Sequence, residues 1–372
     1  MKAKHVNFFS AFIMLSLLLV NNIVLSQPAN NGVRVGVYYF DGWNSMSDFH
    51  ITPSLVHEFP QRESKWGWIT STPRAMKEQI DLAADAGITF FSFCWYYHDS
   101  QSYSTDPVNH AVQLFMSSPN NNRIKFNILV TNAGRYEIGP SEWSTLESLW
   151  IPILKNPQYL ILMGKPYLTF YDVKTLIKNF GSPQAVKAAL DKFRTLAASE
   201  GLGGVTIGAC VGPNPPDLAA AQACGFDVFT GYNYHGSGFY PRPQDANPTP
   251  FPKQAIPISS LLNSDTLVWN VIIHHVSQPY VPLVTLNWDP RPWDDATHHY
   301  KTAPYFVGYS EKSVYESVKS AEHWVQNHAD RDPAKIAILY AWNEYGEGAW
   351  LTPSANDKLR LLEGLKRALL NQ

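Results

Sequence analysis

The sequence predicts an α/β fold, a single (β/α)₈ barrel. Eight short apolar runs rich in β-branched and aromatic residues alternate with segments whose apolar residues recur at helical spacing. Strands that alternate with helices pair in parallel through right-handed crossovers, and eight is the number of strands that closes such a barrel. An open, doubly wound sheet is the alternative.

The eight predicted strands are short and almost continuously apolar, as expected of parallel strands that are buried on both faces. They span 33–40, 88–97, 124–132, 166–172, 204–210, 227–234, 282–288 and 335–344. The clearest helical segments are 74–87, 185–201, 313–329 and 356–370. Gly87 and Gly201 fall at the ends of the first two, where a helix favours a residue of left-handed conformation.

The first 26 residues have the features of a signal peptide. Lys2 and Lys4 precede an apolar core of 13 residues, 8–20, and a small-residue cleavage site follows at 24–26. This core is shorter than the ~20 residues that span a bilayer, and no cysteine follows it for a lipid anchor. We therefore expect a secreted or periplasmic protein without a membrane span, whose single barrel domain occupies residues 27–372.

The composition narrows the classes of partner. Lysine and arginine together number 29 against 31 acidic residues, without a basic run, so we expect no nucleic-acid partner. Aromatic residues make up 13% of the chain and offer flat apolar faces of the kind that stack on sugars. Cys94, Cys210 and Cys224 allow at most one disulfide, and we expect three buried thiols.

Polar and aromatic side chains gather at the carboxyl ends of the predicted strands, which is where barrel enzymes of this class place their active sites. For any one of these residues, a packing or capping role is as strongly expected as a ligand contact. The candidates for substrate binding are Tyr38, Trp95, Asn132, Tyr171, Tyr232, Trp288, Trp342 and Asn343.

Two acids, Glu344 and Glu347, follow the last predicted strand in the stretch AWNEYGEGAWLTP, residues 341–353. On a continuing strand, positions three residues apart face opposite sides, so both acids reach one cleft only if the backbone turns after Glu344. Gly346 and Gly348 permit such a turn. Two solvated loop acids are the plain alternative.

No metal site or cofactor site is predicted. The adjacent histidines at 274–275 and 298–299 do not form a zinc motif. Asp289, Asp294 and Asp295 give only a fragment of a calcium loop, and no phosphate-binding glycine loop is present where one would be needed. We therefore expect chemistry that uses side chains alone.

Four segments carry a resemblance to a known family: GVYYFDGWN (36–44), HEFPQRESKWGW (57–68), FSFCWYY (91–97) and WNEYGEGAWLTP (342–353). They resemble the WbsX-like group, which is related to glycoside hydrolase family 99, the endo-α-mannosidases and endo-mannanases. The likeness covers nearly all of the chain after residue 26. Its most specific element is similar to the family 99 signature, except that Gly346 stands where those hydrolases commonly carry histidine.

The resemblance implies roles for the two acids. Glu347 would be the general acid/base, and Glu344 would deprotonate the 2-hydroxyl of the substrate to give a 1,2-anhydro sugar, with overall retention. This route needs a 2-hydroxyl trans to the leaving group, a condition that α-mannosides and α-rhamnosides meet. A direct nucleophilic role for Glu344 is the alternative, since paired carboxylates serve either mechanism.

The function expected is therefore that of a secreted glycoside hydrolase acting on an oligosaccharide or polysaccharide. The WbsX name also carries a glycosyltransferase label, but nucleotide-sugar donors are not expected outside the cytoplasm. A non-catalytic glycan-binding barrel is the third reading, against which the intact acid pair argues.

Overall fold

The computed structural model describes residues 32–45, 50–99, 106–241, 250–251, 253–297, 299–355 and 358–370. The predicted signal peptide, residues 1–26, lies outside them. Eight strands match the eight predicted runs. They are β1 (Arg34–Tyr39), β2 (Phe90–Trp95), β3 (Lys125–Val130), β5 (Lys165–Phe170), β6 (Thr206–Cys210), β7 (Val228–Thr230), β9 (Leu283–Thr285) and β11 (Ile336–Tyr340).

These strands form a nearly closed parallel barrel. Their order is β7-β6-β5-β3-β2-β1-β11-β9, and every neighbouring pair is parallel. The two ends of this order meet at Phe229 of β7, whose N–H donates to the Pro279 carbonyl at 2.9 Å and whose carbonyl accepts from the Val281 N–H at 2.8 Å. The predicted (β/α)₈ barrel is confirmed, and the open sheet is wrong.

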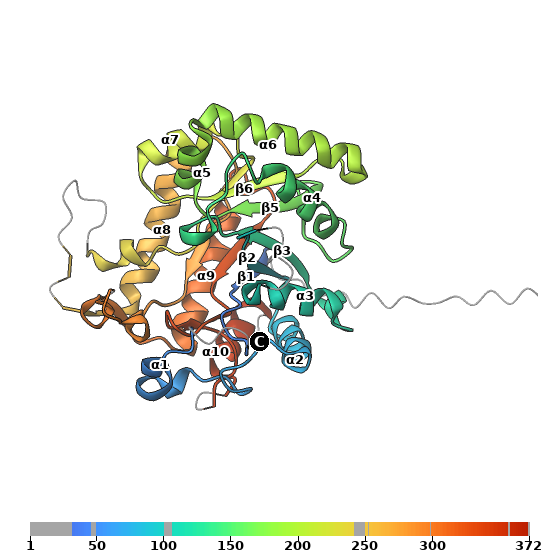
Figure 1. Ribbon diagram of the computed structural model, residues 1–372. Helices are drawn as coiled ribbons and strands as arrows, with labels where there is room; N and C mark the ends of the chain where they lie inside the picture. The colour runs from blue at the N-terminus through green and yellow to red at the C-terminus, as the bar shows by residue number, and fades with distance from the viewer. Residues whose placement is uncertain are drawn as a thin grey trace, which may run out of the picture.

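Helices wrap around the strands (Figure 1), with α5, α6 and α7 together on one side and α2 and α10 on the opposite side. The four predicted helices are present as α2, α6, α9 and α10. The helices span α1 (Pro53–Glu58), α2 (Pro73–Asp85), α3 (His110–Ser117), α4 (Trp143–Leu154), α5 (Val173–Phe180), α6 (Pro183–Ala197), α7 (Pro215–Ala223), α8 (Ile258–His275), α9 (Glu311–Asn327) and α10 (Arg360–Leu370).

Local sequence signals explain where the helices begin and end. Thr72 caps α2, because its side-chain oxygen accepts from the backbone N–H of Ala75 at 3.2 Å and proline follows at the first helical position. Gly87 and Gly201 have φ values of 92° and 86°, which confirms the left-handed residues predicted after two helices. None of the helices in the described ranges is both long and apolar enough to cross a membrane.

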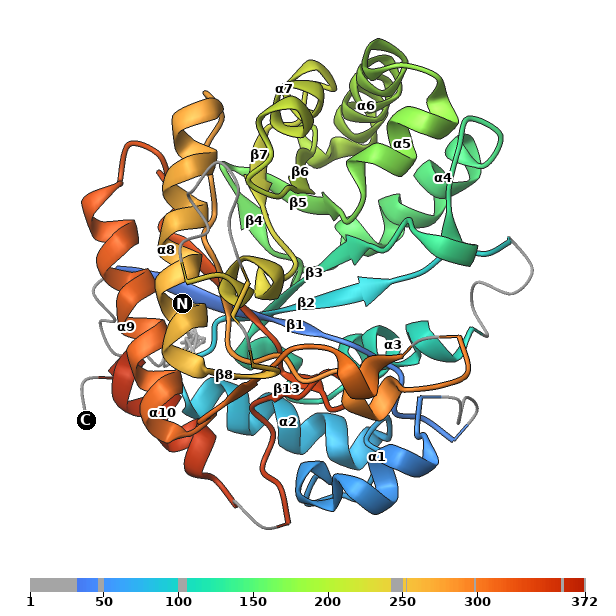
Figure 2. The same ribbon diagram turned by 90° about the vertical axis from the view of Figure 1, so that its left-hand side faces the viewer.

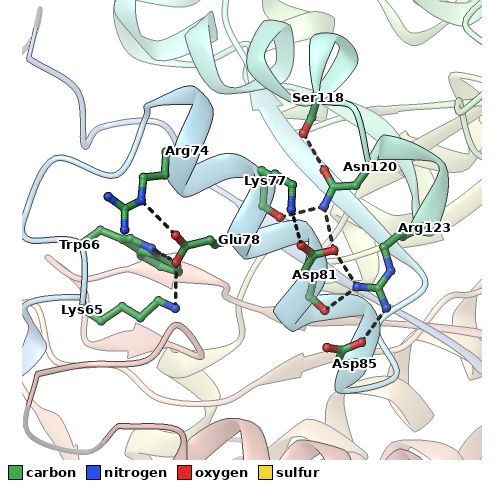
Figure 3. A network of polar contacts seen from close by, with 10 residues as sticks. All are labelled: Lys65, Trp66, Arg74, Lys77, Glu78, Asp81, Asp85, Ser118, Asn120 and Arg123. Atoms are coloured by element: carbon green, nitrogen blue, oxygen red, sulfur yellow. Dashed lines mark hydrogen bonds and ion pairs between the residues drawn. The ribbon is translucent and has the colours of Figure 1, made fainter.

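A network of polar contacts on α2 ties the helix to its neighbours along the barrel wall (Figure 3). Arg123, just before β3, donates to Asp81 at 2.7 Å and to Asp85 at 2.6 Å, and Trp66 donates to Glu78 at 2.9 Å. Exposed ion pairs of this kind contribute about 0–1 kcal/mol each, so the buried apolar face of α2 supplies most of its anchoring.

Shorter elements complete the fold around the carboxyl ends of the strands. Strand β4 (Ile161–Leu162) pairs with β5, β8 (Ala255–Pro257) with β10 (Tyr305–Val307), and β12 (Asn343–Glu344) with β13 (Ala349–Trp350). The loops also contain two 3₁₀ turns, η1 (Pro60–Arg62) and η7 (Arg291–Trp293). All three cysteines are buried free thiols, as predicted.

Candidate active site

The two acids that follow the last barrel strand are brought to one cavity by a tight turn. The chain leaves β11 into the hairpin of β12 and β13, and the backbone N–H of Glu347 donates to the carbonyl of Glu344 at 3.2 Å. Both acids line a cavity of about 600 Å³. The predicted turn after Glu344 is confirmed, and the reading of two solvated loop acids is wrong.

The two glycines of this turn have different roles. Gly348 adopts a positive φ of 75°, the conformation that the sequence pattern predicts for a glycine in a turn. Gly346 does not need a positive φ. A Cβ atom at Gly346 would lie 2.1 Å from the indole ring of Trp293, so glycine is needed here for the close approach of that ring.

The cavity opens at the carboxyl ends of the strands, as expected of this fold. Residues at strand ends and residues from loops both contribute to its wall. The lining residues are Phe40, His50, Thr52, Tyr96, Thr131, Ala133, Gly134, Tyr171, Tyr232, Trp293, Asp294, Asp295, Tyr300, Glu344 and Glu347.

The environments of the two acids differ. Glu344 is 4% exposed and accepts a hydrogen bond from the Tyr232 hydroxyl at 2.8 Å. Burial raises the pKa of Glu344 to about 7, against the opposing effect of the Tyr232 hydrogen bond. Burial alone raises the pKa of Glu347 to about 8, and its Oε2 has no hydrogen-bond partner among the described residues. In the described part of the chain, Glu347 Oε2 lacks a hydrogen bond like the one from Tyr232 that stabilises the Glu344 carboxylate, so Glu347 is the more readily protonated of the two.

Replacing Tyr232 by phenylalanine is expected to lower the rate of any reaction that needs ionised Glu344. The variant removes the hydroxyl that stabilises the carboxylate, and a hydrogen bond to a charged group contributes ~1.5–3 kcal/mol, or roughly 10- to 100-fold in rate. The pKa of Glu344 should rise, so the acid limb of the pH–rate profile should move to higher pH. Tyr159→Phe is the matched control, because the Tyr159 hydroxyl is also buried, donates to the Tyr167 carbonyl at 2.9 Å and does not line the cavity. An unchanged acid limb in Tyr232→Phe would contradict this role.

Two of the predicted binding residues lie in the cavity wall. Tyr171 and Tyr232 both line it, with ring centroids 5.1 Å apart in an edge-to-face arrangement. Burial raises the pKa of both tyrosines above the ordinary value, so both hydroxyls stay protonated. The single O–H of Tyr232 donates to Glu344, which leaves the Tyr171 hydroxyl as the donor of this pair that can reach a ligand.

Trp95 and Trp342 were expected in the cleft, and the structure places both in the packed layer between barrel and helices. Each is 0% exposed; Trp95 packs edge-to-face on Trp150 of α4, and the Trp342 indole donates to Gln79 of α2 at 2.8 Å. Side chains alternate along a strand, so a shift of one residue changes the face. The residue that reaches the cavity here is Tyr96, which directly follows the last residue of β2, Trp95.

Asn132 and Asn343 hold strand ends together and do not line the cavity. The Asn132 amide donates to the Asp172 carbonyl at 2.7 Å and its oxygen accepts from the Asp172 N–H at 3.0 Å. The Asn343 amide makes the same pair of contacts with the backbone of Phe40, at 2.7 and 2.9 Å. The prediction that these amides bind substrate is replaced by a structural role, since both sets of amide atoms are occupied by backbone groups.

Tyr38 and Trp288 also differ from expectation. Tyr38 is buried inside the barrel, where its hydroxyl donates to the Gly231 carbonyl at 2.7 Å, so it supports Tyr232 and does not face the cavity. Trp288 stacks on His235 with ring centroids 3.7 Å apart, outside the cavity lining. Packing therefore accounts for both side chains.

His50 and Trp293 line the cavity but were not among the candidates, because both belong to loops without periodicity. Their rings meet edge-to-face at 5.4 Å. Burial lowers the pKa of His50 to about 4, so its imidazole is neutral at pH 7. Thr52 Oγ1, at the start of α1, donates to the carbonyl of Pro292 at 2.8 Å and joins these two loops, which lie side by side in Figure 2.

Within the described ranges, no group of three or more histidine, cysteine or acidic side chains is arranged to hold a metal ion. The Asp289 carboxylate is bound by Arg62 and Arg291, and the Asp294 carboxylate accepts from the Lys301 N–H at 2.8 Å. His298, one member of the histidine pairs, lies outside the described residues.

Solved structures with a similar fold include glycoside hydrolases. A family 99 endo-α-mannosidase from Bacteroides thetaiotaomicron has a TM-score of 0.58 at 13% identity, covering 90% of this chain and 95% of that one. A glycoside hydrolase-like protein has a TM-score of 0.62 at 14% identity, covering 91% and 94%. A family 5 enzyme from Prevotella bryantii has a TM-score of 0.50 at 11% identity, covering 92% and 98%.

No curated protein sequence matches this chain significantly. The family described as glycosyltransferase WbsX matches residues 56–365, more than half of the 372 residues. This match confirms the resemblance seen in the sequence: the chain belongs to the WbsX family and has the barrel fold of the family 99 glycoside hydrolases.

Proposed function

We propose that this protein is a glycoside hydrolase that cleaves α-linked glycans of the α-mannoside or α-rhamnoside type with retention. One observation carries the proposal. Glu344 and Glu347 line one cavity at the carboxyl end of the barrel, and their surroundings raise their pKa values to about 7 and about 8. Two carboxyl groups with separated pKa values are what glycosidic bond cleavage needs.

The roles follow from these surroundings. Glu347, with the higher pKa, starts protonated and gives its proton to the glycosidic oxygen as the bond to the anomeric carbon breaks. Glu344, held as the carboxylate by Tyr232, takes the proton of the sugar 2-hydroxyl, whose oxygen closes onto the anomeric carbon. Water, deprotonated by Glu347, then opens the 1,2-anhydro ring, and the 2-oxygen regains its proton from Glu344. Direct attack by the Glu344 carboxylate is the alternative first step.

The glycosyltransferase reading is the second candidate, favoured by the family description. The cavity argues against it. Among the described residues that line it, Asp294, Asp295, Glu344 and Glu347 carry carboxyl groups, and none is a lysine or arginine. A nucleotide-sugar diphosphate would meet repulsion there without a cationic partner. A neutral glycan carries no such cost.

Product analysis distinguishes the two functions. The protein is incubated with a panel of α-linked mannans, rhamnans and host-type glycans, and in parallel with nucleotide sugars plus the same glycans as acceptors. Mass spectrometry is expected to find shorter glycans carrying a new reducing end in the first set. Extended glycans that appear only in the presence of nucleotide sugars would overturn the hydrolase assignment.

The pH dependence of activity should reflect both acids. Because Glu344 must be ionised and Glu347 protonated, kcat/KM is expected to follow a bell with limbs near pH 7 and pH 8. Both pKa values are raised on folding from the ordinary value of 4.5, so the folded protein binds more protons than the unfolded chain between about pH 4 and about pH 9. The free energy of unfolding should therefore fall as pH rises through both folded-state pKa values. A flat profile of kcat/KM between pH 6 and about 9 would contradict the roles assigned to ionised Glu344 and protonated Glu347.

A further inference from the structure

We propose that Arg62 and Asp289 are positioning residues that hold the turn between Glu344 and Glu347 in its reactive arrangement. This inference rests on the proposed function and adds two side chains that do not line the cavity. Arg62 ends the 3₁₀ turn η1 in the long connection between β1 and α2, and Asp289 follows β9. Neither is close to the acids in sequence.

The Arg62 guanidinium is directed at the backbone between the two acids. Its Nη1 donates to the carbonyl of Tyr345 at 2.9 Å and is 3.4 Å from the carbonyl of Gly346. These two carbonyls belong to the residues that separate Glu344 from Glu347. A planar guanidinium with several fixed donors can hold two neighbouring carbonyls at once, which the ammonium group of lysine does not reproduce.

Asp289 binds both Arg62 and the backbone of Glu347, at the end of the turn. Its carboxylate accepts from Arg62 Nη2 at 2.5 Å, and its backbone N–H donates to the carbonyl of Glu347 itself at 2.7 Å. Arg291 donates to the same carboxylate from Nε at 2.7 Å and from Nη2 at 2.9 Å. Glu347, which we assign as the proton donor, is thus hydrogen-bonded through its backbone carbonyl to Asp289, and Arg62 holds Asp289 in place.

Burial makes this arrangement costly to disturb. The side chains of Arg62 and Asp289 are 3% and 8% exposed. Burial lowers the pKa of Arg62 to about 10, while Asp289 acts in the opposite direction, so the guanidinium stays charged at neutral pH. Removing Asp289 would leave the buried Arg62 guanidinium without its counter-charge, whereas removing Arg62 leaves Asp289 paired with Arg291. The turn is also closely packed here, since a Cβ at Gly348 would lie 3.0 Å from Asp289 Cβ.

A second arginine, Arg194, allows a positioning role of Arg62 to be told apart from a contribution to stability alone. Elsewhere, Arg194 of α6 makes a similar set of bonds, to Asp227 at 2.9 Å and to the Gly225 carbonyl at 2.7 Å, away from the cavity lining. Arg194→Met is therefore a control for loss of a guanidinium that binds a carboxylate and a backbone carbonyl, at a more exposed position (21% against 3%). A merely structural Arg62 would behave as this control does.

The test compares Arg62→Met, Arg62→Lys and Arg194→Met in steady-state kinetics on the glycan that the wild type hydrolyses. Displacing a catalytic group by ~1 Å costs on the order of 10²-fold, so kcat of Arg62→Met should fall by about that factor with KM unchanged. Arg62→Lys should recover part of the loss, because it keeps the charge beside Asp289. Arg194→Met should lower the melting temperature and leave kcat unchanged.

Crystal structures of the same variants keep this inference testable apart from the proposed function. We expect the 345–348 turn to shift in Arg62→Met while the barrel strands stay in place, whether or not a substrate has been found. Should Arg62→Met fail to fold, Arg62→Lys and Asp289→Asn replace it in both measurements. A folded Arg62 variant with an unmoved turn and the wild-type kcat would overturn the inference.

Discussion

Glu347→Gln is expected to lower the rate of glycan hydrolysis by ~10² to 10⁴, because glutamine keeps the shape of the side chain and cannot transfer a proton. The loss should depend on the leaving group. A natural glycan needs protonation of the departing oxygen, whereas an activated aryl glycoside departs without it. The first-step rate on the aryl substrate should therefore remain close to that of the wild type. Burst and steady-state kinetics on both substrates measure the difference.

A second buried glutamate provides the control. Glu322 on α9 is 1% exposed and pairs with Lys319 at 2.5 Å, and it does not line the cavity. Glu322→Gln should leave the ratio of the rates on the two substrates unchanged. If Glu347→Gln slows both substrates equally, the assignment of Glu347 as the proton donor fails.

Glu344→Gln is expected to slow both kinds of substrate by a similar factor, again ~10² to 10⁴. Its role at the sugar, as base toward the 2-hydroxyl or as nucleophile, does not depend on the leaving group. The alkaline limb of the pH–rate profile, which reflects Glu347, should persist in the residual activity. Single-turnover rates across a series of aryl leaving groups measure the dependence.

The role of Glu344 would be contradicted if the rate loss in Glu344→Gln depended on the leaving group of the substrate. A variant that loses activity on glycans alone and stays fast on the aryl series would exchange the roles of the two acids. Wild-type turnover in both glutamine variants would remove the main support for hydrolase chemistry.

The architecture could be predicted because apolar runs and helical periodicity determine which segments are strands and helices. All eight runs became barrel strands, and Gly87 and Gly201 ended helices as expected. The acid pair could be located for a related reason. Its place after the last strand and the glycine at 348 both favour a turn that brings the two side chains together.

The aromatic binding residues could not be predicted well, because a strand that is apolar on both faces gives no signal of which face is inward. Trp95 and Tyr96 are adjacent and similar in chemistry, and only Tyr96 reaches the cavity. His50 and Trp293 lie in loops whose path depends on tertiary contacts. The partnership of Arg62 with Asp289 joins residues 227 positions apart, a distance over which local sequence patterns carry no information.

The most direct test of this account is the configuration of the sugar first released from an α-linked mannan or rhamnan, followed by ¹H NMR from the first minutes of reaction. Hydrolysis through two inversions at the anomeric carbon predicts that the α anomer appears first and that the β anomer grows only by later mutarotation. A β anomer that appears first would contradict the proposed roles of Glu344 and Glu347, and a folded enzyme that releases no reducing sugar from any α-linked glycan would contradict the hydrolase function itself.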